Sequence, residues 1–306
     1  MVARWFAGLS RNGSGPKFLV LALTATFVAG CRESVLDPAG PVAGGERLIL
    51  MDALGIMLVI VVPTILTTLW CAWWFRASNN AALYRPDWVY SDKLEVVVWC
   101  IPALTVLFLS GLAWTGSHKL DPARPLESRV APLEIQVVSL DWKWLFIYPQ
   151  QHVAVVNRLV LPVGRPVHFR LTSSSVMNVF FVPRLGGEIY TMNGMVTELN
   201  LQADKTGIYP GLSAQFSGDG FAGMHFDTEV TSDQDFNQFV AQAHAAAARL
   251  DDNTYKSLSR PSEGASVQLF AGVSNGLFEN IASRRLPPGE GPSDNGRPLA
   301  SAAGEN

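Results

Sequence analysis

Side chains that could carry out chemistry are sparse in this 306-residue chain. Its cysteines are Cys31, Cys71 and Cys100, and all lie in or beside apolar segments. Because no cysteine follows Cys100, the C-terminal two-thirds of the chain can hold neither a disulfide nor a thiolate metal site. Met224 and His225 are adjacent, but neighbours on a strand point to opposite faces. We therefore expect His225 on the surface, and no metal shared with Met224.

Common catalytic motifs are also missing from the sequence. We find no Ser-His-Asp arrangement, paired acid site, P-loop or dinucleotide-binding glycine motif in a suitable context. The net charge is −3 and no basic run occurs, which argues against nucleic-acid binding. Nine tryptophans and a positive mean hydropathy instead indicate a membrane protein. The chain by itself is expected to carry no catalytic residue.

The N-terminal segment has the pattern of a bacterial export signal. A basic start precedes an apolar stretch at 18–29, which is too short to span a bilayer comfortably. It ends in Val28-Ala29-Gly30-Cys31, which resembles the lipobox of bacterial lipoproteins. That resemblance implies cleavage of residues 1–30 and acylation of Cys31, which would add membrane affinity. The alternative is an uncleaved anchor with a buried cysteine.

Two longer apolar segments are predicted to span the membrane. Residues 53–75 and 96–117 carry no charge, and at ~1.5 Å per residue each reaches ~33 Å, enough for the hydrocarbon core. Pro63 and Pro102 interrupt them, which hints at packing inside a larger complex. We place two transmembrane helices within residues 48–117.

The orientation of these helices does not follow from charge, because Lys and Arg flank both ends of the spans. Cys31 decides it instead, since a lipobox cysteine lies outside the cytoplasmic membrane. The loop at 76–94 is then cytoplasmic, and the C-terminal part is periplasmic.

The pattern changes after a proline-rich linker at 121–132. Short runs separated by Gly, Pro, Asn and Ser predict strands of a Greek-key β-sandwich within residues 130–231. The predicted strands are 133–140, 153–161, 166–172, 179–182, 195–201 and 222–230. Residues 232–285 are predicted to be helical, with Phe236, Phe239, Val240, Ala243 and Ala247 on one face and a second short helix within 267–281. Residues 286–306 are predicted to be disordered.

This layout resembles subunit II of haem–copper terminal oxidases. The resemblance is specific in the stretches ASNNAALYRPDW, SDKLEVVVWCIP, SLDWKWLFIYP, TSSSVMNVFFVPRLGGEIYTMNGM and GLSAQFSGDGFAGMHF. These sequence stretches resemble most the cytochrome bo-type ubiquinol oxidase branch of the family. The fold class that this implies is a two-helix transmembrane hairpin, a cupredoxin-like Greek-key β-sandwich and a short helical C-terminal region.

In cytochrome c oxidases of this family the β-domain holds a dinuclear copper centre. The resemblance assigns its ligand positions here to Asn178, Ser213, Gln215, Ser217, Phe221 and Met224. Serines replace both bridging cysteines, Asn178 and Phe221 replace both histidines, and only Met224 is kept. Soft sulfur ligands suit copper, whereas a serine hydroxyl is a poor bridge and a lone thioether a weak ligand. We expect no metal, and a pocket filled by paired polar groups around an aromatic plug.

Three further residues gain a role from the resemblance. Trp142 matches an aromatic residue that passes electrons inward in copper-containing relatives, but without copper we expect Trp142 and Trp144 to form an aromatic interface. Glu95 opens the second span at its inner end, near the mouth of a proton pathway in subunit I of the family. The alternative for Glu95 is an interfacial carboxylate that reaches water.

We therefore expect a non-catalytic subunit II of a proton-pumping ubiquinol oxidase of the aerobic respiratory chain. Haems and copper are expected in subunit I; the expected partners are subunit I, further small membrane subunits, membrane lipid and, for the complex, quinol. The expected location is the bacterial inner membrane. Two alternatives are a copper-containing cytochrome c oxidase subunit II and a stand-alone, membrane-anchored cupredoxin-like lipoprotein.

Overall fold

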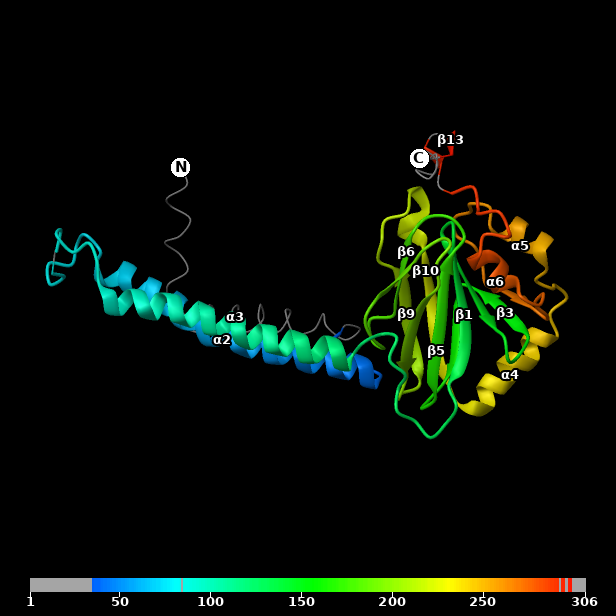
Figure 1. The fold of residues 1–306 in the computed structure, drawn as a ribbon, viewed down its shortest axis with the longest axis horizontal. Coiled ribbons are helices and arrows are strands. Elements are labelled where there is room, and N and C mark those ends of the chain that lie inside the picture. Colours follow the sequence, from blue (N-terminus) through cyan, green and yellow to red (C-terminus); the bar gives the residue numbers. More distant parts are fainter. Residues whose placement is uncertain (1–34, 84, 292, 295–296, 299–306) are drawn as a thin grey trace, which may run out of the picture.

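The computed structural model describes residues 35–83, 85–291, 293–294 and 297–298. Two long helices project from one side of a β-rich domain (Figure 1). Helix α2 (Pro41–Trp74) and helix α3 (Asp92–Lys119) are both long and apolar enough to cross a membrane, and none of the residues in their apolar windows is buried. A helix that is apolar all round and has no protein cover needs lipid or a partner around it.

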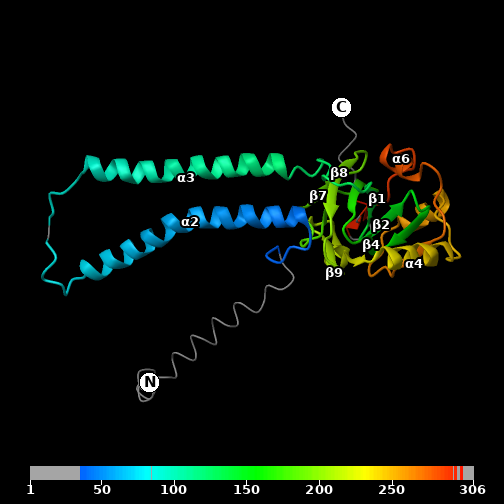
Figure 2. The same ribbon diagram turned by 90° about the horizontal axis from the view of Figure 1, so that it is seen from below.

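The two helices pack together at the end next to the β-domain. Gly116 lets Ile49 approach closely, because a Cβ on this glycine would lie 2.6 Å from the Ile49 Cδ1 atom. Farther out the helices separate, and α2 bends part of the way along (Figure 2). Pro63 lies inside α2, and a proline removes one backbone hydrogen bond of the helix, which accounts for the bend.

The β-domain is a sandwich of two sheets. The first has the order β11-β3-β2-β1-β5-β8 and the second β4-β10-β9-β6-β7. The bounds are β1 Leu133–Leu140, β2 Lys143–Tyr148, β3 Val153–Val156, β4 Arg158–Pro162, β5 Pro166–Ser173, β6 Asn178–Phe181, β7 Ile189–Thr191, β8 Thr197–Gln202, β9 Gly207–Ser213, β10 His225–Thr231 and β11 Gln268–Phe270. A parallel pairing of β1 with β5 and of β10 with β4 joins strands distant in the chain.

Strands β2 and β3 and the second half of β1 are buried on both faces of the first sheet. Along β1 and β2, alternate side chains such as Val137 and Phe146 enter the core between the sheets. Their neighbours, such as Val138 and Leu145, enter a second core beneath the C-terminal region. Strand side chains alternate between faces, so a strand covered on both sides becomes apolar at almost every position.

The C-terminal region supplies that second cover. Helix α4 (Asp233–His244) starts at Ser232, whose Oγ accepts the backbone N–H of Asp235 at 3.2 Å, and buries Phe236, Phe239 and Ala243 against the sandwich. Helices α5 (Asp252–Leu258) and α6 (Leu277–Ala282) lie over the outer face of the first sheet. The fold class is thus a helical hairpin, a cupredoxin-like β-sandwich and a short helical C-terminal region, as the sequence predicts.

Two details of the C-terminal region differ from the expectation. Residues 268–270 form strand β11, which pairs with β3 at the sheet edge and leaves only 277–282 helical. Helix α4 ends at His244, before Ala247, because the chain then turns to pair Leu250 with Val273. The start of the tail also has fixed partners: the Gly289 N–H donates to the Ser174 carbonyl at 2.9 Å.

Candidate functional site

The six positions aligned with copper ligands gather at one end of the second sheet. Asn178 begins β6, Ser213 ends β9, and Met224 directly precedes β10. Between β9 and β10 the short helix η2 (Asp219–Gly223) carries Phe221. Pairing of β6 and β10 with β9 brings the two halves of the motif together, so tertiary structure assembles these positions into one pocket.

Hydrogen bonds hold the first half of this pocket. The Ser213 Oγ donates to the Asn178 Oδ1 at 3.1 Å, and both residues are buried. The Ser213 hydroxyl also lies 3.3 Å from the carbonyl oxygen of Gln215. The amide of Asn178 donates to the Val176 carbonyl at 3.4 Å. Buried polar groups that are paired in this way give a stable, specific packing.

The second half of the pocket pairs Ser217 with Met224. The Ser217 Oγ lies 4.0 Å from the Met224 Sδ, and both side chains are buried. Phe221 does not fill the pocket as the expected plug. It is half-buried and packs edge-on against the exposed ring of Phe216, with 5.6 Å between ring centroids. Phe221 lies in the short η2 helix, so strand alternation could not indicate its direction.

The donor atoms of this pocket do not suit copper. They are an amide, two hydroxyls and one thioether, and Phe221 offers no donor atom at all. A dinuclear copper centre needs thiolate or imidazole ligands, which are soft or borderline. Among the residues that the structure describes, no three His, Cys, Asp or Glu side chains converge in a metal-binding group. His225 is exposed while Met224 is buried, so the two point apart.

Trp142 lies against this pocket. Its indole Nε1 donates to the Ser217 carbonyl at 3.0 Å, and a Cβ on Gly220 would lie 2.3 Å from the Trp142 ring. Trp142 has a φ of 64°, so the turn between β1 and β2 directs its ring onto η2. The glycine makes this close approach of indole and backbone possible.

Buried charges fix the turn that carries Trp142. Burial raises the pKa of the Asp141 carboxyl, although the Ser175 hydroxyl and the Gly291 N–H both donate to it. Burial also lowers the pKa of Lys143, whose Nζ donates to the Arg260 carbonyl at 2.8 Å. These contacts tie the turn to the C-terminal region and to the start of the tail.

Trp144 has a different position from the one expected. Its side chain is fully buried and packs edge-on against Phe180 and Phe226, each at 5.6 Å between ring centroids. Side chains of adjacent strand positions alternate, and Trp144 falls on the inner face of β2. It belongs to the core of the sandwich and is not available to a partner surface.

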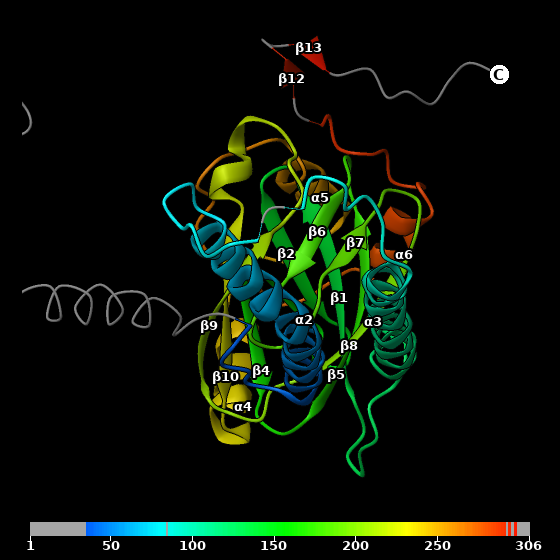
Figure 3. The same ribbon diagram turned by 90° about the vertical axis from the view of Figure 1, so that its left-hand side faces the viewer.

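An exposed apolar surface adjoins the filled pocket, and the sequence patterns did not reveal it. We call it the apolar rim, and it consists of Met177, Tyr190, Met195, Val196 and Phe216, with Phe216 71% exposed. Met177 directly precedes β6, Tyr190 lies in the edge strand β7, Met195 and Val196 lie between β7 and β8, and Phe216 follows β9. Strands β6, β7 and β9 belong to the sheet on the side of the domain from which the helices project (Figure 3). A cluster of exposed large apolar side chains beside a membrane anchor is typical of an interaction surface.

Glu95 lies in the first turn of α3 and is exposed. A hydrogen bond with Glu95 is the main cause that raises the pKa of the nearby Tyr90 hydroxyl. Asp92 occupies the same turn, and both carboxylates suit the positive end of the helix dipole. Cys31, the predicted lipidation site, lies outside the described residues.

Comparisons with known proteins match both parts of the domain. The family model of the cytochrome c oxidase subunit II periplasmic domain matches residues 134–230, and the COX aromatic rich motif matches residues 244–288. The chain is 47% identical to a cytochrome bo(3) ubiquinol oxidase subunit 2 of Pseudomonas aeruginosa, over 88% of this chain and 81% of the relative. A ubiquinol oxidase subunit 2 of Acetobacter aceti is 46% identical, over 85% of each chain.

A solved structure resembles the β-domain. It is the periplasmic domain of subunit II of cytochrome oxidase of Bradyrhizobium japonicum, at 23% identity and a TM-score of 0.36. The match covers 38% of this chain and 96% of that one.

Proposed function

The chain belongs to the ubiquinol oxidase subunit 2 family of haem–copper oxidases, and from this membership we propose that it acts without a metal centre of its own. It is a membrane-anchored subunit of an oxidoreductase complex that oxidises quinol and reduces O2 to water. The observation that carries the proposal is the donor set of the pocket, in which Ser213 and Ser217 pair with Asn178 and Met224.

The absence of thiolate copper ligands in the β-domain accounts for quinol, and not a cytochrome, as the electron donor of the complex. A subunit without a copper centre cannot take electrons from a water-soluble cytochrome and relay them inward, so quinol delivers electrons directly to a large subunit I that holds the haems and copper. Trp142 then serves packing: its indole fastens the β1–β2 turn to η2 through Ser217. The alternative of a copper-containing cytochrome c oxidase subunit II has no suitable ligands in this pocket.

Docking on subunit I is the main role that we propose for the external domain. The exposed helices α2 and α3 supply contacts in the membrane, and the apolar rim supplies contacts above it. A free lipoprotein would leave both apolar surfaces without cover, which disfavours the stand-alone alternative. In this arrangement Cys31 is lipidated after removal of residues 1–30, the loop at 76–94 is cytoplasmic, and the β-domain is periplasmic at the inner membrane.

Purification of the tagged chain in mild detergent tests this proposal. We expect it to bring down a haem-containing large subunit, identified by mass spectrometry, and to show no long-wavelength thiolate–copper absorption after incubation with copper. A His225→Ala variant controls for copper held at the exposed histidine. Recovery of the chain alone, without haem, would contradict the complex; a stoichiometric copper centre in this chain would contradict the metal-free role.

Glu95 provides a second test, on proton entry. We propose that this carboxylate, at the cytoplasmic end of α3, helps deliver protons to subunit I. Glu95→Gln removes the titratable proton but keeps the shape and the Tyr90 contact, so turnover of the assembled oxidase should fall about fivefold, or about 1 kcal/mol in barrier. Asp92→Asn, in the same helical turn, is the matched control and should retain its rate. Oxygen consumption measures both, and an unchanged rate in Glu95→Gln would leave only the interfacial role.

A further inference from the structure

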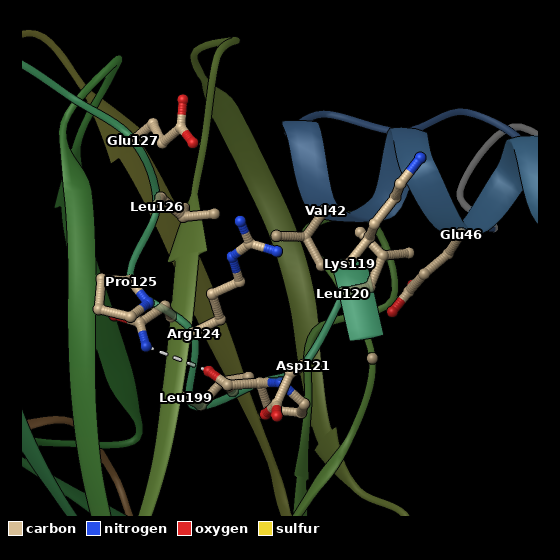
Figure 4. Close-up of a pocket in the computed structure, with 13 residues that line it drawn as sticks. Val42, Glu46, Lys119, Leu120, Asp121, Arg124, Pro125, Leu126, Glu127 and Leu199 are labelled. Atoms are coloured by element: carbon tan, nitrogen blue, oxygen red, sulfur yellow. Dashed lines mark hydrogen bonds between the residues drawn. The ribbon is translucent and has the colours of Figure 1, made fainter. Parts of the chain in front are cut away.

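A cavity of about 410 Å³ lies where the two helices join the β-domain (Figure 4). Its walls come from the first turns of α2, the last residue of α3, the linker that follows and strand β8. Lys119 ends α3 only two residues beyond the apolar span, or ~3 Å along the axis. With α2 and α3 spanning a membrane, as proposed above, the cavity lies at the level of the lipid headgroups on the side of the β-domain.

Two cations, Lys119 and Arg124, line this cavity and have no salt-bridge partner among the residues that the structure describes. Figure 4 shows the Arg124 guanidinium extending between Leu126 and Val42. A guanidinium with free N–H groups offers the fork geometry that binds phosphate oxygens.

The carboxylates of the cavity are not equivalent. The Asp121 Oδ1 accepts the N–H of Ala123 at 3.0 Å, and Glu46 accepts a backbone hydrogen bond from Gly187. Asp121 is therefore hydrogen-bonded to its own linker, and Glu46 to the backbone of the β-domain. Glu127 is exposed, lines the same cavity and has no salt bridge among the described residues. The cavity thus offers two free cations and one free carboxylate.

The remaining wall is apolar. Val42, Leu120, Leu126 and Leu199 line the cavity beside its charged groups. An inorganic anion would gain nothing from these side chains, whereas the glycerol and upper acyl carbons of a lipid would bury apolar surface against them. A purely anionic headgroup would also lie near Glu46 and Glu127, which repel it.

We propose that this cavity binds the headgroup of a zwitterionic phospholipid of the phosphoethanolamine class. Arg124 binds its phosphate, Glu127 binds its ammonium group, and the leucines and Val42 contact its glycerol region; Lys119 adds positive charge at the edge of the cavity. The inference rests on the proposed function in one respect, that α2 and α3 span a membrane. A lipid held here would fill the gap between the membrane anchor and the external domain.

Lipid retention by the purified complex tests the site. The complex is taken from a bilayer of mixed phosphatidylethanolamine and phosphatidylglycerol, and native mass spectrometry weighs the retained adducts. We expect an intact phosphatidylethanolamine on the wild type and about tenfold less on Arg124→Gln. Arg129→Gln, an exposed arginine of the same linker outside the cavity, is the matched control and should match the wild type. Glu127→Gln should lower the ratio of ethanolamine to glycerol lipid.

The outcomes separate the lipid site from the oxidase role. Haem content measures assembly of the complex, and the mass of the adduct identifies the retained lipid. Either result can therefore be negative while the other is positive. Retention of phosphatidylglycerol alone, a phosphate adduct in place of a lipid, or equal retention by Arg124→Gln and the wild type would overturn the lipid site even in a haem-loaded complex. Loss of haem with lipid still retained by the isolated chain would support the site and contradict the oxidase role.

Discussion

Replacing Phe226 with alanine is expected to lower the free energy of unfolding of the β-domain by about 3–5 kcal/mol. The Phe226 ring lies at the centre of the core, 5.1 Å from Phe146, 5.3 Å from Phe180 and 5.6 Å from Trp144, measured between ring centroids. Gly211 leaves room for it, since a Cβ there would lie 2.2 Å from the ring. Removal of the ring leaves a cavity that rigid aromatic neighbours cannot close.

Denaturant unfolding of the full chain in detergent measures this loss, with near-ultraviolet circular dichroism as the signal of aromatic packing. Phe216→Ala is the matched control, because it makes the same chemical change at a ring that is 71% exposed. Its effect should stay within about 0.5 kcal/mol. Equal destabilisation by the two variants would show that the core is not organised around Phe226.

Replacing Phe216 with aspartate is expected to separate this chain from subunit I. Phe216 is the most exposed residue of the apolar rim, and a charge there would have to be buried without a partner at a docked surface. A loss of about 2 kcal/mol, typical of a central interface residue, corresponds to roughly thirtyfold weaker association. The measurement is the haem recovered per tagged chain in mild detergent.

Val267→Asp is the matched control for the interface. Val267 is 51% exposed and directly precedes β11, which pairs with β3. Strand β3 lies at the side of the domain away from the helices (Figure 1). Replacement of Val267 should leave haem recovery unchanged. Equal recovery for Phe216→Asp and the wild type, with the domain still folded, would remove the apolar rim from the docking surface and leave assembly to the transmembrane helices.

The polar side chains of the filled pocket link neighbouring strands by hydrogen bonds. Asn178 and Ser213 lie on neighbouring strands, so their hydrogen bond connects β6 and β9 where a metal ligand set would have linked them. Ser217 is linked twice, through its carbonyl to Trp142 and through its hydroxyl to Met224. Each buried polar atom named here has a partner, which avoids the cost of burying it unpaired.

The sequence by itself determined which metal-ligand side chains the β-domain of this protein can offer. Because Cys100 is the last cysteine, no thiolate site could form in the β-domain, whatever its fold. The two membrane-spanning segments could also be predicted from the sequence, since length and apolar composition alone decide whether a helix can cross a membrane. Most strands could be predicted from local alternation and turn residues. The sequence motifs identified which residues occupy the ligand positions of the pocket.

Only the tertiary structure decided which faces are covered. Phe221 packs on the exposed Phe216 and Trp144 lies in the core, although both were expected elsewhere. A short helix sets the first position and strand alternation the second. Residues 268–270 became a strand because β3 offers an open edge for them. The cavity at the junction of the helices and the β-domain brings together Glu46, Arg124 and Leu199, which are far apart in the chain. Local patterns report period and polarity, whereas burial depends on contacts between distant segments, which no local pattern contains.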